Sequence, residues 1–233
     1  MKIALLGYGR MGKAIEKIAI ERGHEIVLKV NDNTEKTDLS IADIAIDFSI
    51  PNAAVGNITN CFNSSIPVVS GTTGWLDKYD EMCTLCNQKE GGFIYASNFS
   101  LGVNLFFELN KKVAQLMNPM LDTYGVTTEE IHHTKKLDAP SGTAITLAQG
   151  IIENTKFKDW KLYEGDKENL TITAKRVGDV PGTHSITYHS EVDEIEIKHT
   201  AYNRQGFALG AVVAAEWLQN KKGIYGMKDV LGL

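Results

Sequence analysis

Two adjacent histidines, two adjacent lysines and a Pro-Ser-Gly-Thr run stand within residues 130–143, EIHHTKKLDAPSGT. His132 and His133 are of the residue type that exchanges protons near neutral pH, since an unperturbed imidazole titrates at about 6.5. Lys135 and Lys136 add positive charge beside them, which is a common way for a site to tune its proton donors. This combination predicts a reaction site that transfers protons.

The residues that follow predict an anion-binding helix start. Pro140 keeps the residue before it out of helical angles, and Ser141 can cap a helix that begins at Gly142. The first turn of such a helix has free N–H groups, and Gly142 lets an anion approach the backbone. The sequence therefore places proton donors a short loop away from a cradle for an anion.

A metal site is the alternative role for the two histidines. Adjacent strand residues point to opposite faces of a sheet, and no glutamate or cysteine partner stands at a metal-site spacing. We therefore expect no metal. Cys83 and Cys86 form a C-x-x-C inside a predicted helix over residues 76–89, and even with Cys61 no fourth zinc ligand is evident. Buried or half-buried thiols are the better interpretation of all three.

The composition is that of an ordinary globular protein, with 233 residues, 43% hydrophobic and 23% charged residues. A net charge of -5 and a pI near 5.7 argue against a nucleic-acid partner, which would favour a basic surface. The N-terminus has too short an apolar run for a signal peptide, and no apolar stretch approaches the length of a membrane span. We therefore expect a cytoplasmic protein without a membrane partner.

The N-terminal residues predict a strand, a glycine loop, a helix and a second strand. An apolar run over residues 2–6 leads into GYGRMG, a helical pattern follows to Gly23, and residues 25–30 predict a second strand. A β-glycine loop-α-β unit of this length is the context of a dinucleotide site, with the pyrophosphate at the helix N-terminus. The predicted contacts are Gly7, Tyr8, Gly9, Arg10, Met11 and Gly12.

The end of the second strand indicates which nicotinamide cofactor binds. Asp32, or Asn31 beside it, is placed to bond the adenosine ribose hydroxyls, and an acidic or amide residue there favours NADH. An NADPH site usually offers an arginine to the 2′-phosphate; Lys29 or Lys36 could reach it instead. We expect NADH as the favoured cofactor, with NADPH as the alternative.

Further strand and helix patterns extend this unit into a doubly wound sheet. Strands are predicted over residues 41–48, 66–70 and 93–95, and a helix opens at Pro51 with Ser49 as its cap. Ligands bind outside the carboxyl ends of the strands of such sheets. The loops at two of these ends are therefore expected to line the nicotinamide: Gly71, Thr72 and Thr73, and Ala96, Ser97, Asn98 and Phe99.

The second half of the chain has a different pattern. A long helix over residues 101–117 precedes strands predicted near 126–133, 170–176, 184–189 and 191–198, and such runs of strands indicate a mixed or antiparallel sheet. His184, His189 and His199 could be functional, but each is isolated on an alternating strand, so a half-exposed sheet residue is the better interpretation. The fold class is thus α/β: a Rossmann-type domain over residues 1–100, to which helices of 206–233 return, and a substrate-binding and oligomerisation domain over 101–205.

With these motifs in place, the sequence resembles the dihydrodipicolinate reductase family, whose members are 4-hydroxy-tetrahydrodipicolinate reductases. The resemblance spans the chain through GYGRMG, IDFS at 46–49, GTTG at 71–74, SNFSLGVN at 97–104, EIHHTKKLDAPSGTA at 130–144 and RVGDVPGTH at 176–184. Asn31-Asp32 stands where some members carry Glu-Arg.

The resemblance implies an NAD(P)H-dependent oxidoreductase of lysine and diaminopimelate biosynthesis that forms tetrahydrodipicolinate with loss of water. It implies that His132 is the proton donor and acceptor, Lys136 the second catalytic cation and His133 a substrate contact. Gly142 and Thr143 match the cradle for a carboxylate of the dicarboxylate substrate, with Lys135 or Arg204 as counter-charge. The resemblance also implies a homotetramer joined through the sheet of the second domain.

Two other functions fit parts of the pattern. Another two-domain NAD(P)-dependent reductase of amino or imino acids would share the glycine loop but not HHTKKLDAPSGT. A dinucleotide sensor would keep the Rossmann half, yet it needs no proton donors.

Overall fold

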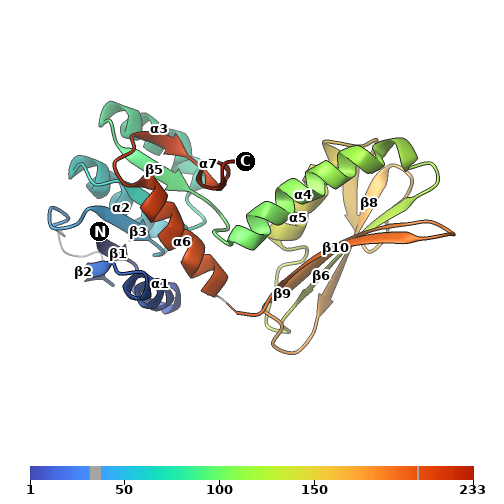
Figure 1. The fold of residues 1–233 in the computed structure, drawn as a ribbon, viewed down its shortest axis with the longest axis horizontal. Coiled ribbons are helices and arrows are strands. Elements are labelled where there is room, and N and C mark those ends of the chain that lie inside the picture. The colour runs from blue at the N-terminus through green and yellow to red at the C-terminus, as the bar shows by residue number, and fades with distance from the viewer. Residues whose placement is uncertain (32–37, 204) are drawn as a thin grey trace. The chain divides into compact units, whose positions relative to one another are not determined.

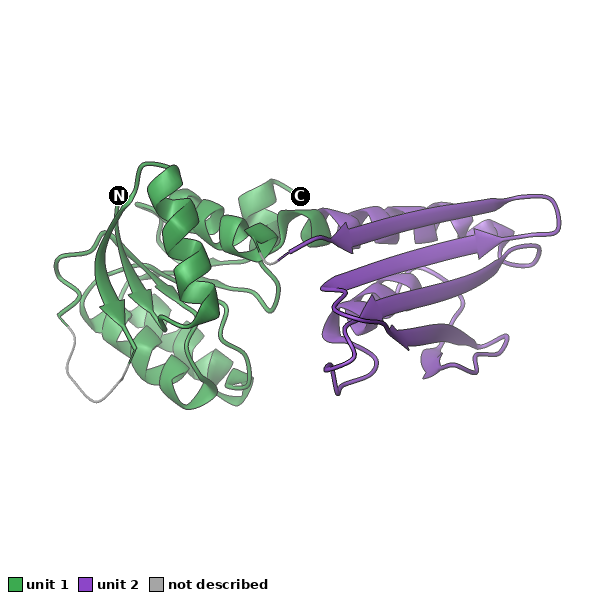
Figure 2. Ribbon diagram, turned by 90° about the horizontal axis from the view of Figure 1, so that it is seen from below, with its two compact units in different colours: residues 1–104, 204–233 green, residues 105–203 purple. Residues whose placement is uncertain are grey.

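The computed structural model describes residues 1–31, 38–203 and 205–233 and contains two compact units. Unit 1 comprises residues 1–104 and 204–233, and unit 2 comprises residues 105–203 (Figure 2). The first boundary lies within the helix α4 (Leu101–Met117).

Unit 1 is built on a six-stranded sheet with the order β11-β5-β4-β3-β1-β2, in which all neighbouring strands are parallel. Its strands are β1 (Lys2–Leu6), β2 (Glu25–Val30), β3 (Ile44–Asp47), β4 (Val68–Ser70), β5 (Gly92–Tyr95) and β11 (Gly223–Tyr225). Helices cover both faces because successive strand residues are apolar on both sides. Ile3 and Leu5 pack into one buried cluster, whereas Ala4 and Leu6 pack into the other.

The two clusters assign the helices of unit 1 to the two faces of its sheet. Helices α1 (Arg10–Glu21) and α6 (Gln205–Leu218) contribute to the first cluster with α7 (Met227–Leu231), and Figure 1 shows α6 beside this sheet. Helices α2 (Pro51–Asn63) and α3 (Tyr79–Gln88) contribute to the second, and the 3-10 turn η1 (Leu76–Lys78) precedes α3. The result is the doubly wound arrangement expected from the sequence.

Unit 2 has a five-stranded mixed sheet with the order β10-β9-β6-β8-β7. Its strands are β6 (Gly125–His132), β7 (Asp159–Leu162), β8 (Asn169–Arg176), β9 (Gly182–His189) and β10 (Glu194–Ala201). Strand β6 is parallel to β8 and antiparallel to β9, which confirms the predicted mixed sheet. Helices α4 and α5 (Gly142–Ile152) share a buried core with one face of it, and the 3-10 turn η2 (Asn118–Met120) follows α4.

The opposite face of this sheet is polar. In Figure 2 the strands of unit 2 lie in front of its helices, so this face is seen without a helix over it. The strand register places Thr127 beside Thr171 and Thr187 there, and Glu129 beside Thr173 and Ser185.

The structure corrects some of the expected elements. Strands β7 and β11 were not predicted. Ser49 is not the cap of α2, because Ile50 occupies the N-cap position and makes no side-chain cap bond. All three cysteines are free thiols, as expected, with Cys61 and Cys86 buried. Among the helices of the described residues, none is long and apolar enough to cross a membrane.

Candidate active site

The glycine loop after β1 has the shape that a dinucleotide requires. Gly7 has a φ of +95°, and a Cβ there would stand 2.2 Å from the Phe48 carbonyl oxygen. A Cβ on Gly12 would stand 2.3 Å from the Gly7 carbonyl oxygen. Gly9 is the N-cap of α1 and has open space around its Cβ position, so an anion can approach the N–H groups of the helix start.

Side chains next to this loop form a small charged cluster. The Tyr8 hydroxyl donates to the Glu16 carboxylate, and the Lys29 Nζ lies 2.5 Å from that carboxylate and 4.9 Å from the centre of the Tyr8 ring. The hydrogen bond from Lys29, followed by the one from Tyr8, lowers the pKa of Glu16. Lys29 is therefore already paired at the end of β2. Asn31 follows β2 and is exposed, whereas the predicted contact Asp32 lies outside the described residues, as does Lys36.

A buried carboxyl group, Asp47, holds the loops at the ends of β3 and β4 together. Its Oδ1 accepts hydrogen bonds from the Ser49 hydroxyl at 2.7 Å and the Asn57 amide at 2.9 Å. Its Oδ2 accepts from the Ser70 and Thr72 hydroxyls, both at 2.8 Å. The Ser49 N–H donates in turn to the Thr72 Oγ1 at 2.8 Å. The predicted nicotinamide loop is thus fixed to its neighbour through one acidic side chain.

The two predicted nicotinamide loops differ in how much of them is accessible. Thr72 is buried in the Asp47 network, whereas Thr73 is exposed and Gly71 is half-buried. In the other loop Ser97 is exposed, and Ala96 and Asn98 are half-buried. The Phe99 side chain is buried in the core of unit 1, where its ring lies 5.6 Å from the Phe48 ring.

In unit 2, strand register brings together residues that are far apart in the sequence. His184 of β9 pairs directly with Glu130 of β6, and Arg176 of β8 pairs with His132 of β6. Directly paired residues share a face, and residues two apart on a strand share one too. All four side chains therefore lie on the face that α4 and α5 cover.

Glu130 is the centre of this group and is 0% exposed. Its Oε1 lies 3.0 Å from the Arg176 Nη2, and its Oε2 accepts the Ser141 N–H at 3.1 Å. The same Oε2 lies 3.3 Å from the His132 Nδ1, out of line for a good hydrogen bond, and 3.7 Å from the His184 Nε2. Four groups from four segments of the chain thus converge on one carboxylate.

The charge states follow from these contacts. Burial alone would raise the pKa of Glu130, but His132, Ser141 and Arg176 together lower the pKa to about 2, so the carboxylate is ionised. Burial, followed by the nearby His132, lowers the pKa of His184 to about 4, so this imidazole is neutral near pH 7. His184 is only 5% exposed, which corrects the prediction of a half-exposed sheet residue.

Arg176 also fixes the loop that carries Lys136. Its Nε donates to the Lys136 carbonyl at 3.3 Å and its Nη2 to the Asp138 carbonyl at 2.6 Å. The Lys136 Nζ lies 2.6 Å from the Asp138 carboxylate, and this contact lowers the pKa of Asp138. The ammonium group of Lys136 is thereby held in a defined loop conformation.

Helix α5 has the predicted cap. The Ser141 hydroxyl accepts the Ala144 N–H at 3.2 Å, which makes Ser141 the N-cap of α5, and it lies 3.2 Å from the His184 Nε2. Gly142 is exposed, and its Cβ position has no heavy atom within 4 Å, so its N–H is accessible to a ligand. Thr143 and His133 are half-buried. Within the described part of the chain, the predicted substrate-side residues therefore lie on β6, the loop after it and the start of α5; Arg204, the alternative to Lys135 as counter-charge, lies outside the described residues.

Glu130, His132 and His184 are close enough together to hold a metal ion. The Arg176 guanidinium, 3.0 Å from the same carboxylate, opposes a cation there by charge repulsion. The arrangement fits a hydrogen-bonding network better than a metal centre.

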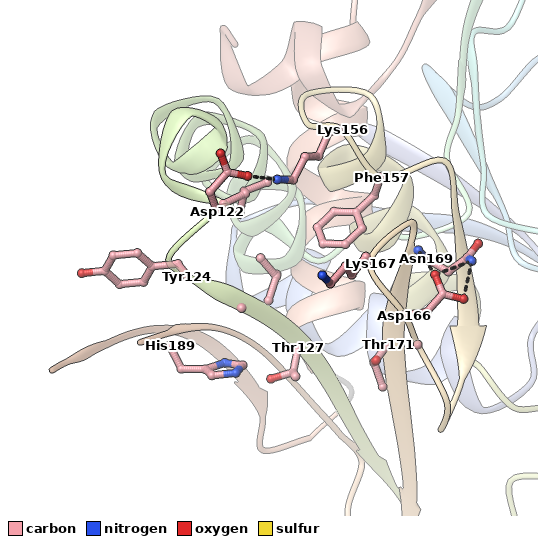
Figure 3. A pocket seen from close by; sticks show the side chains of 14 residues that line it. Asp122, Tyr124, Thr127, Lys156, Phe157, Asp166, Lys167, Asn169, Thr171 and His189 are labelled. Atoms are coloured by element: carbon pink, nitrogen blue, oxygen red, sulfur yellow. Dashed lines mark hydrogen bonds and ion pairs between the residues drawn. The ribbon is translucent and has the colours of Figure 1, made fainter. Parts of the chain in front are cut away.

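A pocket of about 540 Å³ lies elsewhere in unit 2 (Figure 3). Lys156 pairs with Asp122 at its edge, and Tyr124, Thr127 and His189 line the side that the strands form. Gly125 is the first residue of β6 and His132 is the last, which places them about 23 Å apart at a strand rise of ~3.3 Å per residue. This pocket is therefore separate from the Glu130 network.

Comparisons with known proteins decide the family. The family models for the N-terminus and the C-terminus of dihydrodipicolinate reductase match residues 29–99 and 102–231. A 4-hydroxy-tetrahydrodipicolinate reductase of Christiangramia forsetii is 61% identical over 99% of this chain and 98% of its own. The chain belongs to the dihydrodipicolinate reductase family. As a member it is an oxidoreductase that uses a nicotinamide dinucleotide and acts on a small molecule.

Two further relatives agree with the family. The 4-hydroxy-tetrahydrodipicolinate reductase of Methanoregula boonei is 38% identical over 82% of this chain and 75% of its own. A dipicolinate-bound dihydrodipicolinate reductase from Paenisporosarcina sp. TG-14 superimposes with a TM-score of 0.77 over 97% of both chains at 22% identity, which supports the fold.

Sequence reasoning missed Glu130, Arg176, His184 and Asp47 as parts of these networks. Glu130 carried a usable signal, because it stands two residues before His132 on a predicted strand and must share its face. Arg176 and His184 are the two ends of the RVGDVPGTH motif, but only the strand register shows what they pair with.

Proposed function

We propose that this protein is a 4-hydroxy-tetrahydrodipicolinate reductase of lysine and diaminopimelate biosynthesis. The observation that carries the proposal is the Glu130 network, which joins the predicted proton donor His132 to the helix start at Ser141. The substrate is the dicarboxylate that dihydrodipicolinate synthase produces. Water is lost, one hydride and one proton are added, and the product is tetrahydrodipicolinate.

The residues of unit 2 supply binding and proton transfer. One substrate carboxylate binds the N–H groups of Gly142 and Thr143, where the helix start favours negative charge. Lys136 stabilises the negative charge that develops at the ring nitrogen, and His132 donates the proton that neutralises it. His133 contacts the substrate from the same loop.

The residues of unit 1 bind the cofactor, which supplies the hydride. Gly7, Gly9 and Gly12 form the turn around the pyrophosphate at the start of α1. NADH is favoured over NADPH, because Lys29 is already paired with Glu16 and Asn31 offers an amide to the ribose hydroxyls. Unit 1 is thus the dinucleotide-binding domain, and unit 2 binds the substrate.

The oligomer we propose is a homotetramer of a cytoplasmic enzyme, joined through the sheet of unit 2. The polar face of that sheet, on which threonine, serine and glutamate side chains lie, supports this interface.

A coupled assay tests the function. Purified protein is mixed with dihydrodipicolinate synthase, pyruvate and aspartate semialdehyde, and the loss of nicotinamide absorbance is followed with NADH and then with NADPH. We expect synthase-dependent oxidation, faster with NADH. A protein that binds NADH but oxidises neither cofactor would instead be a dinucleotide sensor, and faster oxidation of NADPH would reverse the cofactor assignment.

A further inference from the structure

We propose that Glu130 is a positioning residue of the active site, which orients the proton donor His132 and the anion-binding start of α5 with one carboxylate. This inference rests on the proposed function. Glu130 is fully buried, and its two oxygens contact groups of His132, Ser141, Arg176 and His184.

The contact with His132 selects one tautomer of its ring. The Nδ1 lies 3.3 Å from the Glu130 Oε2, so a hydrogen on Nδ1 is attracted by the carboxylate. The Nε2 lies 3.2 Å from the position that a Cβ on residue 182 would occupy, and Gly182 leaves that position open. The neutral ring therefore carries its hydrogen on Nδ1, and Nε2 is the atom that takes up and donates the transferred proton.

The contact with Ser141 fixes the anion cradle. Glu130 accepts the Ser141 N–H at 3.1 Å, and the Ser141 hydroxyl accepts the Ala144 N–H at 3.2 Å. The N–H groups of Gly142 and Thr143 lie in the chain between the N–H groups of Ser141 and Ala144. They belong to the first helix turn, whose N–H groups have no acceptor within the helix. Glu130 thereby holds the cradle and the proton donor in one geometry.

Arg176 stabilises the buried negative charge of Glu130. It supplies the opposite charge at 3.0 Å, and its bonds to the Lys136 and Asp138 carbonyls attach the lysine loop to the same carboxylate. Removal of the charge on Glu130 is therefore expected to disturb donor, cradle and lysine loop together.

The test compares Glu130→Gln with Glu168→Gln in the coupled assay. Glu168 is exposed, stands just before β8 and pairs with Lys158, away from the Glu130 network. We expect Glu130→Gln to lower kcat by about 10²-fold, since small misplacements of reacting groups have effects of this size. The Kd for dipicolinate in the presence of NADH should rise by about tenfold, because the cradle loses an anchor. Glu168→Gln should change neither quantity, and Glu130→Asp should recover part of the kcat.

Ring ¹⁵N spectra of histidine-labelled protein give a readout that a general loss of stability would not produce. In the wild type at a pH where His132 is neutral, we expect the hydrogen on Nδ1, and in Glu130→Gln a mixture of tautomers. A wild-type ring with its hydrogen on Nε2 would overturn the proposal even if the variant does not fold. So would a Glu130→Gln enzyme with the kcat of Glu168→Gln. The wild-type coupled assay tests the proposed function separately, since it needs no variant.

Discussion

Two buried carboxyl groups organise the two units, and they do so with different partners. Asp47 in unit 1 accepts hydrogen bonds from three hydroxyls and one amide, and no cation pairs with it among the described residues. Glu130 in unit 2 contacts a guanidinium, two imidazoles and a backbone N–H. Neutral donors hold loops in place, whereas imidazoles exchange protons. The difference indicates that Asp47 shapes a binding surface and that Glu130 supports chemistry.

The largest effect is expected on the lysine that the Glu130 network positions. Lys136→Ala should lower kcat by about 10²-fold or more, the range for one electrostatic or acid–base group. The coupled assay measures it, with Lys158→Ala as the control because Lys158 is exposed and pairs with Glu168 away from the site. Equal turnover by wild type and Lys136→Ala would show that Lys136 has no catalytic role, and the contrast between Glu130 and Asp47 would lose its support.

For Asp47 the expected effect is on stability. Asp47→Ala leaves the donors of Ser49, Asn57, Ser70 and Thr72 without their acceptor, so the free energy of unfolding should fall by about 3 kcal/mol. Urea denaturation measures this change. Asp77→Ala on the exposed η1 should stay within about 0.5 kcal/mol of the wild type. A similarly small change in Asp47→Ala would mean that its network does not hold the loops.

The buried imidazole of His184 should make the stability of the protein depend on pH, which the hydroxyl and amide partners of Asp47 do not. Its folded pKa of about 4 lies below the ordinary histidine pKa of about 6.5, so between these values the unfolded chain binds more protons. Stability should therefore fall as the pH drops from about 6.5 towards 4, by about 2 kcal/mol. The groups that face this ring are Glu130, His132, Lys136, Ser141 and His199.

Unfolding at a series of pH values measures this loss. Glu130 contributes in a lower window, because its folded pKa of about 2 keeps its stabilisation until the pH falls below about 4. His184→Asn should flatten the curve between pH 6.5 and 4, whereas His189→Asn on the exposed end of β9 should not. Identical curves for the two variants would exclude His184 as the titrating group.

The smallest expected effect concerns cofactor preference. Asp32→Ala should raise the KM for NADH more than that for NADPH, by a few-fold or about 1 kcal/mol, because a ribose hydroxyl loses its acceptor. The ratio of the two KM values measures it. An unchanged ratio would show that Asp32 does not determine which cofactor is preferred.

Much of unit 1 could be predicted from the sequence because its signals are local. A glycine loop between an apolar run and an amphipathic helix defines one α/β unit, and the following strands are continuous apolar runs. The short strands DWKL of β7 and GIY of β11 have no such pattern. Ser49 had the residue type and position of a helix cap, but its hydroxyl is used by Asp47.

The candidate site in unit 2 was only partly predictable. The residues from His132 to Thr143 follow one another in the chain, so their types and spacing were enough to predict a site. Arg176 and His184 join it through strand pairing across more than forty residues, and a sequence does not encode that register locally. Burial of His184 followed from its place on β9, between β6 and β10.

The most direct test of the central claim is a side-by-side measurement of kcat and of the KM for NADH in Glu130→Gln and Asp47→Asn. The account predicts a kcat about 10²-fold lower with an unchanged KM for NADH in Glu130→Gln. It predicts a kcat within about fivefold of the wild type and a raised KM for NADH in Asp47→Asn. The reverse pattern, with kcat lost in Asp47→Asn and kept in Glu130→Gln, would contradict it.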